Sequence, residues 1–169
     1  MSLGVVGCGR LGKMVAGYGA AFGMDVGYFD PYVNVNSRFS RYDSLEQLVE
    51  NSDVVTIHVP HEKSTENLFD NAMFSHFRPG AYLINTSRGE LVDQKALLEH
   101  LESGSLGGAA LDVFEDEFDP KFDIGASPLW RYATLNNNLV LTPHIGGSTE
   151  DAWSETEKFT IAKAIEQLG

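Results

Sequence analysis

Short apolar runs alternate along the chain with segments in which apolar residues recur every three or four positions. The short runs, several of them rich in β-branched residues, predict strands, and the helically spaced segments predict amphipathic helices. Strands are expected at residues 3–6, 26–29, 54–59, 81–84, 108–113 and 139–141, and helices at 11–22, 44–50, 93–102 and 148–168. Alternating strands and helices imply crossover connections, so the pattern predicts an α/β fold whose mostly parallel sheet carries helices on both faces.

Polar residues at the predicted helix starts support these boundaries. Ser44 begins a capping box, Asp93 precedes the third helix, and Ser148 or Thr149 is expected to cap the last one. The one long stretch without a clear pattern is 118–138. A loop of that length inside a compact domain is usually functional or mobile, so we expect an irregular loop there.

The composition narrows the class of protein. The chain has 169 residues, of which 43% are hydrophobic and 21% charged, which is ordinary for one globular domain. Its 24 Asp and Glu residues against 12 Lys and Arg residues give a net charge of −12, which argues against nucleic acid or an anionic membrane as a partner. A single cysteine, Cys8, rules out an intrachain disulfide and fits a cytoplasmic location. Neither a membrane span nor a secretory signal is expected.

A Gly-Cys-Gly-Arg-Leu-Gly segment joins the first strand to the first helix. In this setting Gly7 permits a tight turn, Gly9 lets the backbone approach a pyrophosphate, and Gly12 lets the helix pack closely on the strand. The phosphates would lie at the positive end of the helix, where Arg10 and Leu11 stand. The motif therefore predicts a dinucleotide site, with a plain glycine turn or another nucleotide as the alternatives.

An acidic residue at the end of the second strand strengthens that prediction. Asp30 stands where a carboxylate accepts hydrogen bonds from the adenosine ribose hydroxyls. The residues after it carry no Lys or Arg before Arg38, so a 2′-phosphate would be repelled, which favours NAD over NADP. The alternative is a surface aspartate that opens an Asp-Pro turn.

Two later turns, each after a predicted strand, carry side chains suited to chemistry on a carbonyl. Arg88, in an Asn-Thr-Ser-Arg-Gly turn, can hold a carboxylate through two parallel hydrogen bonds and polarise a neighbouring carbonyl. His144, in a Thr-Pro-His-Ile-Gly-Gly turn, is the type of group that gives and takes a proton near neutral pH, and an adjacent acid would orient its ring. The acidic run 115–119 offers such an acid. A surface arginine, a structural histidine and a solvated acidic loop are the alternatives for these features.

Together these motifs resemble the NAD-dependent D-2-hydroxyacid dehydrogenase family. The resemblance runs over almost the whole chain and includes the glycine motif, Asp30-Pro31-Tyr32, His58-Val59-Pro60 with Thr65, the Arg88 turn, Leu111-Asp112-Val113 and the segment from Thr142 to Thr149. It implies a Rossmann-type, doubly wound fold, NAD as cofactor and a 2-hydroxy or 2-oxo acid as substrate. Residues 1–169 would form one NAD-binding domain, with the family's substrate-binding domain absent from the chain and almost no turnover by the domain alone.

The resemblance also implies roles for individual residues. Arg88 matches the arginine that holds the substrate carboxylate, and His144 matches the acid/base. Glu117, rather than Glu115, matches the acid that pairs with the histidine, and Asp112 matches a residue near the nicotinamide. No metal site is expected, and the expected cofactor contacts are Gly7, Gly9, Arg10, Leu11, Gly12, Asp30, Val59, Pro60, Thr65, Thr86, Ser87, Arg88, Asp112, His144 and Gly147.

Some residues depart from the family pattern, and other functions share part of it. His61 stands where the family usually has an apolar residue, Phe118 replaces a common proline, and the loop that follows is longer than usual. The 3-phosphoglycerate dehydrogenase branch is the most similar. The C-terminal-binding protein corepressors share the fold and these residues and use NAD(H) largely to control assembly, so a non-enzymatic regulator is the alternative function. An S-adenosylmethionine-dependent methyltransferase would not need the Arg, Glu and His set.

The resemblance further implies a homodimer formed through this domain. Trp130 and Trp153 are candidate anchors, because interfaces favour aromatic side chains. The alternative is that both are core residues of their own protomer.

Overall fold

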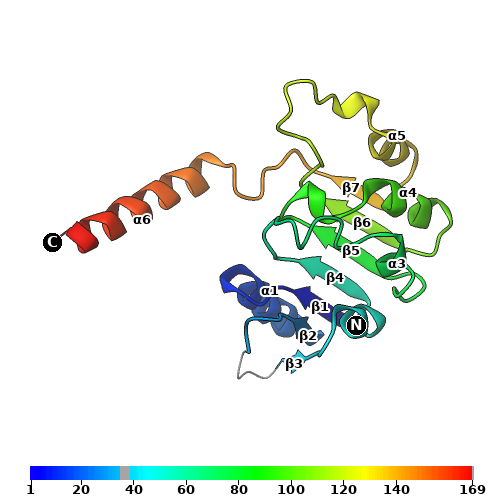
Figure 1. The fold of residues 1–169 in the computed structure, drawn as a ribbon, viewed down its shortest axis with the longest axis horizontal. Coiled ribbons are helices and arrows are strands. Elements are labelled where there is room, and N and C mark those ends of the chain that lie inside the picture. Colours follow the sequence, from blue (N-terminus) through cyan, green and yellow to red (C-terminus); the bar gives the residue numbers. More distant parts are fainter. Residues whose placement is uncertain (35–38, 169) are drawn as a thin grey trace.

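A seven-stranded sheet, with every strand parallel to its neighbours, runs through the computed structural model, which describes residues 1–34 and 39–168 (Figure 1). The strand order is β3-β2-β1-β4-β5-β6-β7. The chain adds β2 and β3 on one side of β1 and the later strands on the other side, and open α/β sheets bind their ligands at such a switch point, here between β1 and β4. This order confirms the predicted α/β fold of the doubly wound, Rossmann type. The strands are β1 (Ser2–Val6), β2 (Asp25–Phe29), β3 (Ser40–Arg41), β4 (Val54–Ile57), β5 (Tyr82–Asn85), β6 (Gly108–Leu111) and β7 (Leu139–Leu141).

The predicted helix starts are confirmed by their caps. Ser44 accepts a hydrogen bond from the Gln47 N–H, and Asp93 accepts from the first turn of the next helix. At the last helix the cap is Thr149, whose hydroxyl accepts from the Ala152 N–H. The helices are α1 (Arg10–Ala21), α2 (Leu45–Glu50), α3 (Asn71–Phe74), α4 (Gln94–Glu102), α5 (Pro128–Leu135) and α6 (Glu150–Leu168), with short 3-10 turns η1 (Gly89–Leu91) and η2 (Ile124–Ala126).

The stretch 118–138 contains ordered structure, so the expectation of an irregular loop was wrong. It holds η2 and all of α5. Pro128 is the first residue of α5, where a backbone N–H has no partner within the helix, so a proline costs no hydrogen bond there. Leu129 is buried in the core. A helix of eight residues is too short for its apolar spacing to establish a period. Two elements of two and four residues, β3 and α3, were also not predicted, and β4 ends at Ile57 rather than at residue 59.

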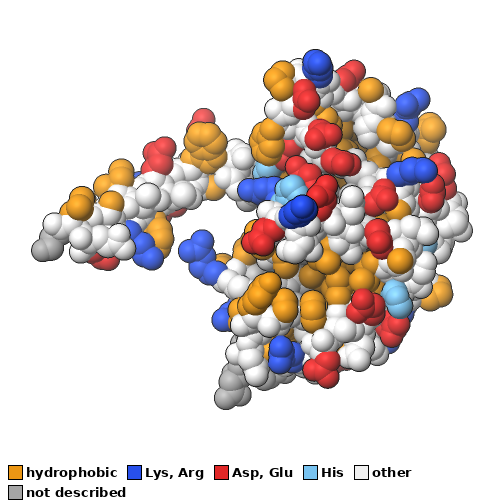
Figure 2. Space-filling view, in the orientation of Figure 1, with side chains coloured by type: hydrophobic (Ala, Val, Ile, Leu, Met, Phe, Trp, Pro, Cys, Tyr) orange, Lys and Arg blue, Asp and Glu red, His pale blue; other side chains and the backbone are white. Residues whose placement is uncertain are grey.

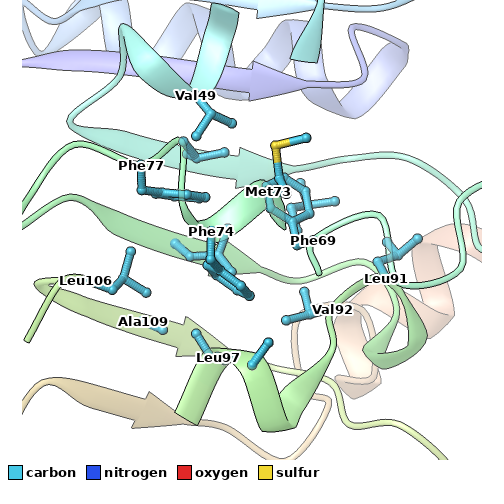
Figure 3. Close-up of a cluster of buried hydrophobic side chains, with 14 of the residues drawn as sticks. Val49, Phe69, Met73, Phe74, Phe77, Leu91, Val92, Leu97, Leu106 and Ala109 are labelled. Atoms are coloured by element: carbon cyan, nitrogen blue, oxygen red, sulfur yellow. The ribbon is translucent and has the colours of Figure 1, made fainter. Parts of the chain in front are cut away.

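The larger core lies between the sheet and the helices α2 to α5 on one face. Its centre is aromatic: the rings of Phe69, Phe74 and Phe77 lie 5.5–6.4 Å apart, between α3 and the sheet (Figure 3). Leu83 of β5 and Leu97 of α4 are fully buried in the same cluster. Tight packing on this face gives the sheet a rigid support beneath the loops at its carboxyl edge.

On the opposite face, α1 packs on β1 and β2 through small residues. Its buried positions are Gly12, Ala16 and Gly19, which allow the helix backbone to approach the sheet closely. The large apolar side chains that reveal the helix in the sequence point away from the sheet instead and are exposed: Leu11, Met14, Tyr18 and Phe22. Farther along this face, Tyr82 of β5 and Val140 of β7 remain 47% and 56% exposed, because within the described residues no helix covers them.

The last helix, α6, extends away from the sheet and has no buried residue within its described part (Figure 1). Hydrophobic side chains are visible along its surface in Figure 2. Trp153 on α6 is 62% exposed and Trp130 on α5 is 42% exposed. Neither tryptophan is therefore a core residue of its own protomer.

Two glycines of α1 should respond with opposite sign to the same substitution. A Cβ at position 12 would lie 2.0 Å from the Gly7 carbonyl oxygen, so we expect Gly12→Ala to lower the free energy of unfolding by about 1–3 kcal/mol. At Gly17 a Cβ meets nothing within 4 Å, and Gly17→Ala should raise it by about 0.5–1 kcal/mol because alanine is the better helix former. Urea unfolding measures both values. An unchanged or raised stability of Gly12→Ala would contradict the close approach of α1 to the sheet at position 12.

Candidate active site

The glycine turn joins β1 to α1 in a conformation that only glycines accommodate. Gly7 has a backbone φ of +87°, in the left-handed region, and its N–H donates to the Phe29 carbonyl oxygen at 2.9 Å. A Cβ at this position would lie 2.7 Å from the His58 carbonyl oxygen. At Gly9 the turn is open, since a Cβ there would meet nothing within 4 Å. The turn thus offers a bare stretch of backbone to a ligand.

The N-terminus of α1 differs from those of the other early helices. Within the described residues no side chain caps α1, whereas α2, α3 and α4 are capped by Ser44, Asp70 and Asp93. The N–H groups of Arg10 and Leu11 therefore lie at the positive end of a 12-residue helix without a side-chain partner. Free N–H groups beside an open glycine turn fit the pyrophosphate of a dinucleotide.

Asp30 is buried beside this turn and accepts three hydrogen bonds from the described residues. Its Oδ2 accepts from the Cys8 N–H at 2.8 Å, and its Oδ1 accepts from the N–H groups of Tyr32 and Val33, each at 2.9 Å. A carboxylate has about four acceptor positions, so roughly one remains for a ribose hydroxyl. Cys8 is fully buried, and burial raises the pKa of its thiol, so this cysteine is a packing residue of the turn.

The structure brings a basic residue near Asp30 that the linear sequence does not reveal. Parallel pairing of β2 with β3 sets Arg41 opposite Tyr28, and the Arg41 Nη2 donates to the Asp30 carbonyl oxygen at 3.4 Å. Arg38, the first basic residue in sequence after Asp30, lies outside the described residues. Asp30 therefore has a basic neighbour in space, although the sequence directly after it has no Lys or Arg before Arg38.

The other expected cofactor contacts lie on loops at the same edge of the sheet. The Thr65 hydroxyl donates to the Pro60 carbonyl oxygen at 2.9 Å and so closes the loop after β4. The Ser87 hydroxyl donates to the Ile57 carbonyl oxygen at 2.7 Å, which ties the end of β4 to the turn after β5. The remaining contacts are half-buried or exposed along this edge: Val59, Thr86 and Gly147.

Asn85, the last residue of β5, holds the turn that carries Arg88. It is buried; its Nδ2 donates to the Arg88 carbonyl oxygen at 2.7 Å and its Oδ1 accepts the Ser87 N–H at 3.0 Å. The Arg88 side chain is exposed, with one hydrogen bond of 2.6 Å from Nη1 to the Ser87 carbonyl oxygen. Sequence reasoning assigned no role to Asn85, although a polar residue directly after a predicted strand was the available signal.

His144 and Glu117 form the pair that the resemblance implied. The His144 Nδ1 lies 2.6 Å from the Glu117 Oε1, and the two side chains are 31% and 13% exposed. The second carboxylate oxygen of Glu117 accepts the Phe114 N–H at 3.1 Å, which fixes the carboxylate in place. Glu115 lies among other acids instead: burial, together with the charges of Asp116 and Asp93, raises its pKa. The structure therefore pairs the histidine with Glu117 and not with Glu115.

The backbone at His144 is strained. Its φ is +52°, in the left-handed region, where a residue other than glycine costs on the order of 1 kcal/mol. Beside the ring lies a mainly apolar pocket of about 730 Å³, lined by Phe118, Trp130 and Leu141 among others. The Phe118 ring centroid is 5.8 Å from that of His144. Apolar walls lower the local dielectric and strengthen the contact between the imidazole and the carboxylate.

Asp112, at the end of β6, points into the His144 turn. Its carboxylate accepts hydrogen bonds from the Thr142 hydroxyl and from the Ile145 and Gly146 N–H groups. Burial raises the pKa of Asp112, but these hydrogen bonds and the charge of His144 outweigh it, so the pKa lies below its usual value. The carboxylate is therefore ionised at neutral pH.

Comparison with known proteins places these features in a family. Residues 1–146 match the family model described as D-isomer specific 2-hydroxyacid dehydrogenase, NAD binding domain. The chain belongs to this family. It is 38% identical over 159 residues to D-3-phosphoglycerate dehydrogenase of Bacillus subtilis, a match that covers 89% of this chain and 28% of that protein. It is 37% identical over 157 residues to D-lactate dehydrogenase of Treponema pallidum, covering 89% of this chain and 47% of that protein.

Solved structures of the family have the same fold. A D-2-hydroxyisocaproate dehydrogenase superposes with a TM-score of 0.88 at 33% identity, covering 99% of this chain and 52% of that one. D-lactate dehydrogenase from Aquifex aeolicus, complexed with NAD and lactic acid, gives a TM-score of 0.82 at 36% identity, covering 99% and 54%. The D-isomer-specific dehydrogenase domain described here thus spans about half the length, or less, of the curated relatives it matches.

The family match confirms the expected cofactor class, NAD. It does not separate the branches, because D-3-phosphoglycerate and D-lactate dehydrogenases match at nearly equal identity. Within the described part of this dehydrogenase domain, no helix has the length and apolar character needed to cross a membrane. Among residues 1–34 and 39–168, no three metal-binding side chains lie close enough to share an ion.

His58, at the end of β4, should make the stability of the domain depend on pH. Burial lowers its pKa, whereas the unfolded chain takes up the proton near its ordinary value of about 6.5. Because the unfolded state binds this proton more readily, the free energy of unfolding should fall as the pH drops below about 6.5, by at most about 1.4 kcal/mol per pH unit.

Urea unfolding at about pH 7.5 and about pH 5.5 measures this dependence. We expect His58→Gln to lose less stability between the two pH values than the wild type. His61→Gln, at an exposed position, is the matched control and should keep the full dependence. An identical loss in His58→Gln and wild type would show that His58 does not titrate in this range.

Proposed function

We propose that this chain is the NAD-binding part of an enzyme that transfers a hydride between NAD(H) and a 2-hydroxy or 2-oxo acid. The observation that carries the proposal is the His144–Glu117 pair at 2.6 Å, on the same edge of the sheet as the exposed guanidinium of Arg88. A carbonyl reduction needs a proton donor and an anion-binding group together, and this edge offers both. A further domain outside these 169 residues would complete the substrate cleft, so we expect almost no turnover by the chain alone.

In this proposal the chain's own side chains have separate tasks. Arg88 holds the substrate carboxylate and polarises the neighbouring carbonyl oxygen. His144 gives a proton to that oxygen during reduction and takes it back during oxidation, and Glu117 orients the ring and stabilises its protonated form. NAD(H), when bound at the glycine turn, supplies or accepts the hydride. The buried Asp30 would accept a hydrogen bond from the adenosine ribose.

A regulator that only senses NAD(H) remains the second function with the same residues. The curated relatives named above are dehydrogenases, which favours the enzyme. A sensing role needs the glycine turn and Asp30, but it gives no chemical task to a histidine and a carboxylate in contact. Turnover of the intact protein on 2-oxo acids separates the two functions.

The pH–rate profile of the intact enzyme tests the catalytic roles. Replacing His144 by Gln should lower turnover by about 10²–10⁴-fold, the usual contribution of a positioned general acid/base. Glu117→Gln should move the optimum for 2-oxo acid reduction to lower pH, because a neutral amide no longer stabilises the protonated imidazole. Glu115→Gln is the matched control, and its profile should stay where the wild-type profile lies. An unshifted profile in Glu117→Gln would remove Glu117 from the proposal.

The cofactor preference is tested by calorimetry on the 169-residue chain. We expect NADH to bind more tightly than NADPH, because the carboxylate of Asp30 repels a 2′-phosphate. Asp30→Ala should narrow the difference, mainly by weakening NADH, and Arg41→Ala made in that variant should weaken NADPH again. Equal affinity of the wild type for both cofactors would refute the role of Asp30.

We also propose that the enzyme is a cytoplasmic homodimer joined through this domain. The exposed apolar side chains of α1 and of the neighbouring sheet face support the proposal, as do the exposed Trp130 and Trp153. Sedimentation of the chain at micromolar concentration should give twice the monomer mass. A single species of monomer mass would count against assembly through this domain.

A further inference from the structure

Asp112 is one of five buried polar or charged side chains in the described part of the chain. The resemblance implied a place for it near the nicotinamide. In the structure, without any ligand, its carboxylate is directed at the backbone of residues 142–146. A buried charge needs hydrogen-bond partners, and this one finds all of its observed partners in the turn that carries His144.

Three donors from that turn converge on the one carboxylate. Oδ1 accepts from the Thr142 hydroxyl at 2.5 Å and from the Ile145 N–H at 3.0 Å, and Oδ2 accepts from the Gly146 N–H at 2.8 Å. These donors lie on both sides of His144 in sequence. The turn is therefore held before and after the histidine by a side chain that belongs to the neighbouring strand.

These three hydrogen bonds explain how His144 keeps an unfavourable backbone conformation. A non-glycine residue at a φ of +52° persists only where its surroundings over-determine it. Apart from Asp112, the turn is held by the contact of the His144 ring with Glu117 and by a few backbone hydrogen bonds. The Thr142 N–H donates to the Leu111 carbonyl oxygen, the His144 N–H to the Thr142 carbonyl oxygen, and the Ser148 N–H to the Ile145 carbonyl oxygen at 3.4 Å. The residues from Pro143 to Thr149 are otherwise mostly exposed.

The register of the sheet places Asp112 within hydrogen-bond distance of the turn that carries His144. Leu111 pairs with Leu141, so the residues that follow, Asp112 and Thr142, emerge side by side from β6 and β7. On the other side, the Asp112 N–H donates to the Asn85 carbonyl oxygen at 3.0 Å. Asp112 is thus anchored to β5 through its backbone while its side chain holds the turn after β7.

We propose that Asp112 is a positioning residue, which sets the strained His144 turn and so brings the imidazole onto Glu117 before any cofactor binds. The proposal rests on the proposed function only in giving that pair a catalytic task. Contact of Asp112 with a bound cofactor would be an additional property, since about one acceptor position of its carboxylate is still free.

The test is amide hydrogen exchange, followed by NMR on the 169-residue chain without NAD. Asp112→Asn keeps the size of the side chain but replaces one acceptor oxygen by an NH₂ group, so one N–H of the turn loses its partner. We expect the Ile145 and Gly146 amides to exchange at least about tenfold faster. We expect the short hydrogen bond to slow the exchange of the proton between the His144 Nδ1 and Glu117 in the wild type, and we expect this proton to exchange too fast to be seen in Asp112→Asn.

The control is Asp93→Asn, an equal change of charge at the cap of α4, which should leave both signals of the His144 turn as they are. Amides of the core strand β5 should exchange at wild-type rates in all variants. Thr142→Val removes one of the three donors at a half-buried site and should give a smaller acceleration, so the proposal remains testable if Asp112→Asn does not fold.

Two results would overturn the proposal. One is wild-type exchange at Ile145 and Gly146 in both Asp112→Asn and Thr142→Val. The other is an equal acceleration of turn and core amides, which would make Asp112 a residue of general stability. Because no turnover is measured, a failure of this proposal is distinct from a failure of the proposed function.

Discussion

Parallel pairing of the strands is the constraint on which the rest of this molecule depends. Every strand runs in the same direction, so every strand ends at the same edge and every connection must cross back over a face. The register is also even: Ile57, Asn85, Leu111 and Leu141 lie side by side at the ends of four adjacent strands. Residues that immediately follow them in four distant parts of the sequence therefore emerge next to one another.

Local chemistry explains why much of the fold could be predicted from the sequence. The glycine turn, the cap at Ser44 and the cap at Asp93 depend on residues within a few positions of one another, and each is found where its spacing predicts. The sequence does not show which face of α1 packs on the sheet, because one face carries large apolar residues and another carries small ones. The small residues Gly12 and Ala16 face the sheet, since close approach of the backbones decides the packing there.

The parts of the site that could not be predicted depend on contacts across long separations. Arg41 approaches Asp30 only because a two-residue strand pairs with β2. The choice of Glu117 came from a resemblance, and the acidic run itself does not show which carboxylate reaches His144. Asp112 was expected at the cofactor, whereas its observed partners lie about thirty residues farther along the chain. Periodicity and capping rules contain no information on such contacts.

The uncapped start of α1 has a consequence for how this domain responds to its surroundings. Where α2, α3 and α4 carry a serine or aspartate whose side chain caps them, α1 leaves its first N–H groups without a side-chain partner within the described residues. A bound dinucleotide would therefore act as the missing cap. The first N–H groups of α1 would then receive their hydrogen-bond partners from the ligand and not from a side chain of this protein. Ligand at about a hundred times its Kd adds about 2.7 kcal/mol to folding stability. The concentration of that molecule would then set how much of the domain is folded, in addition to how much of its site is filled.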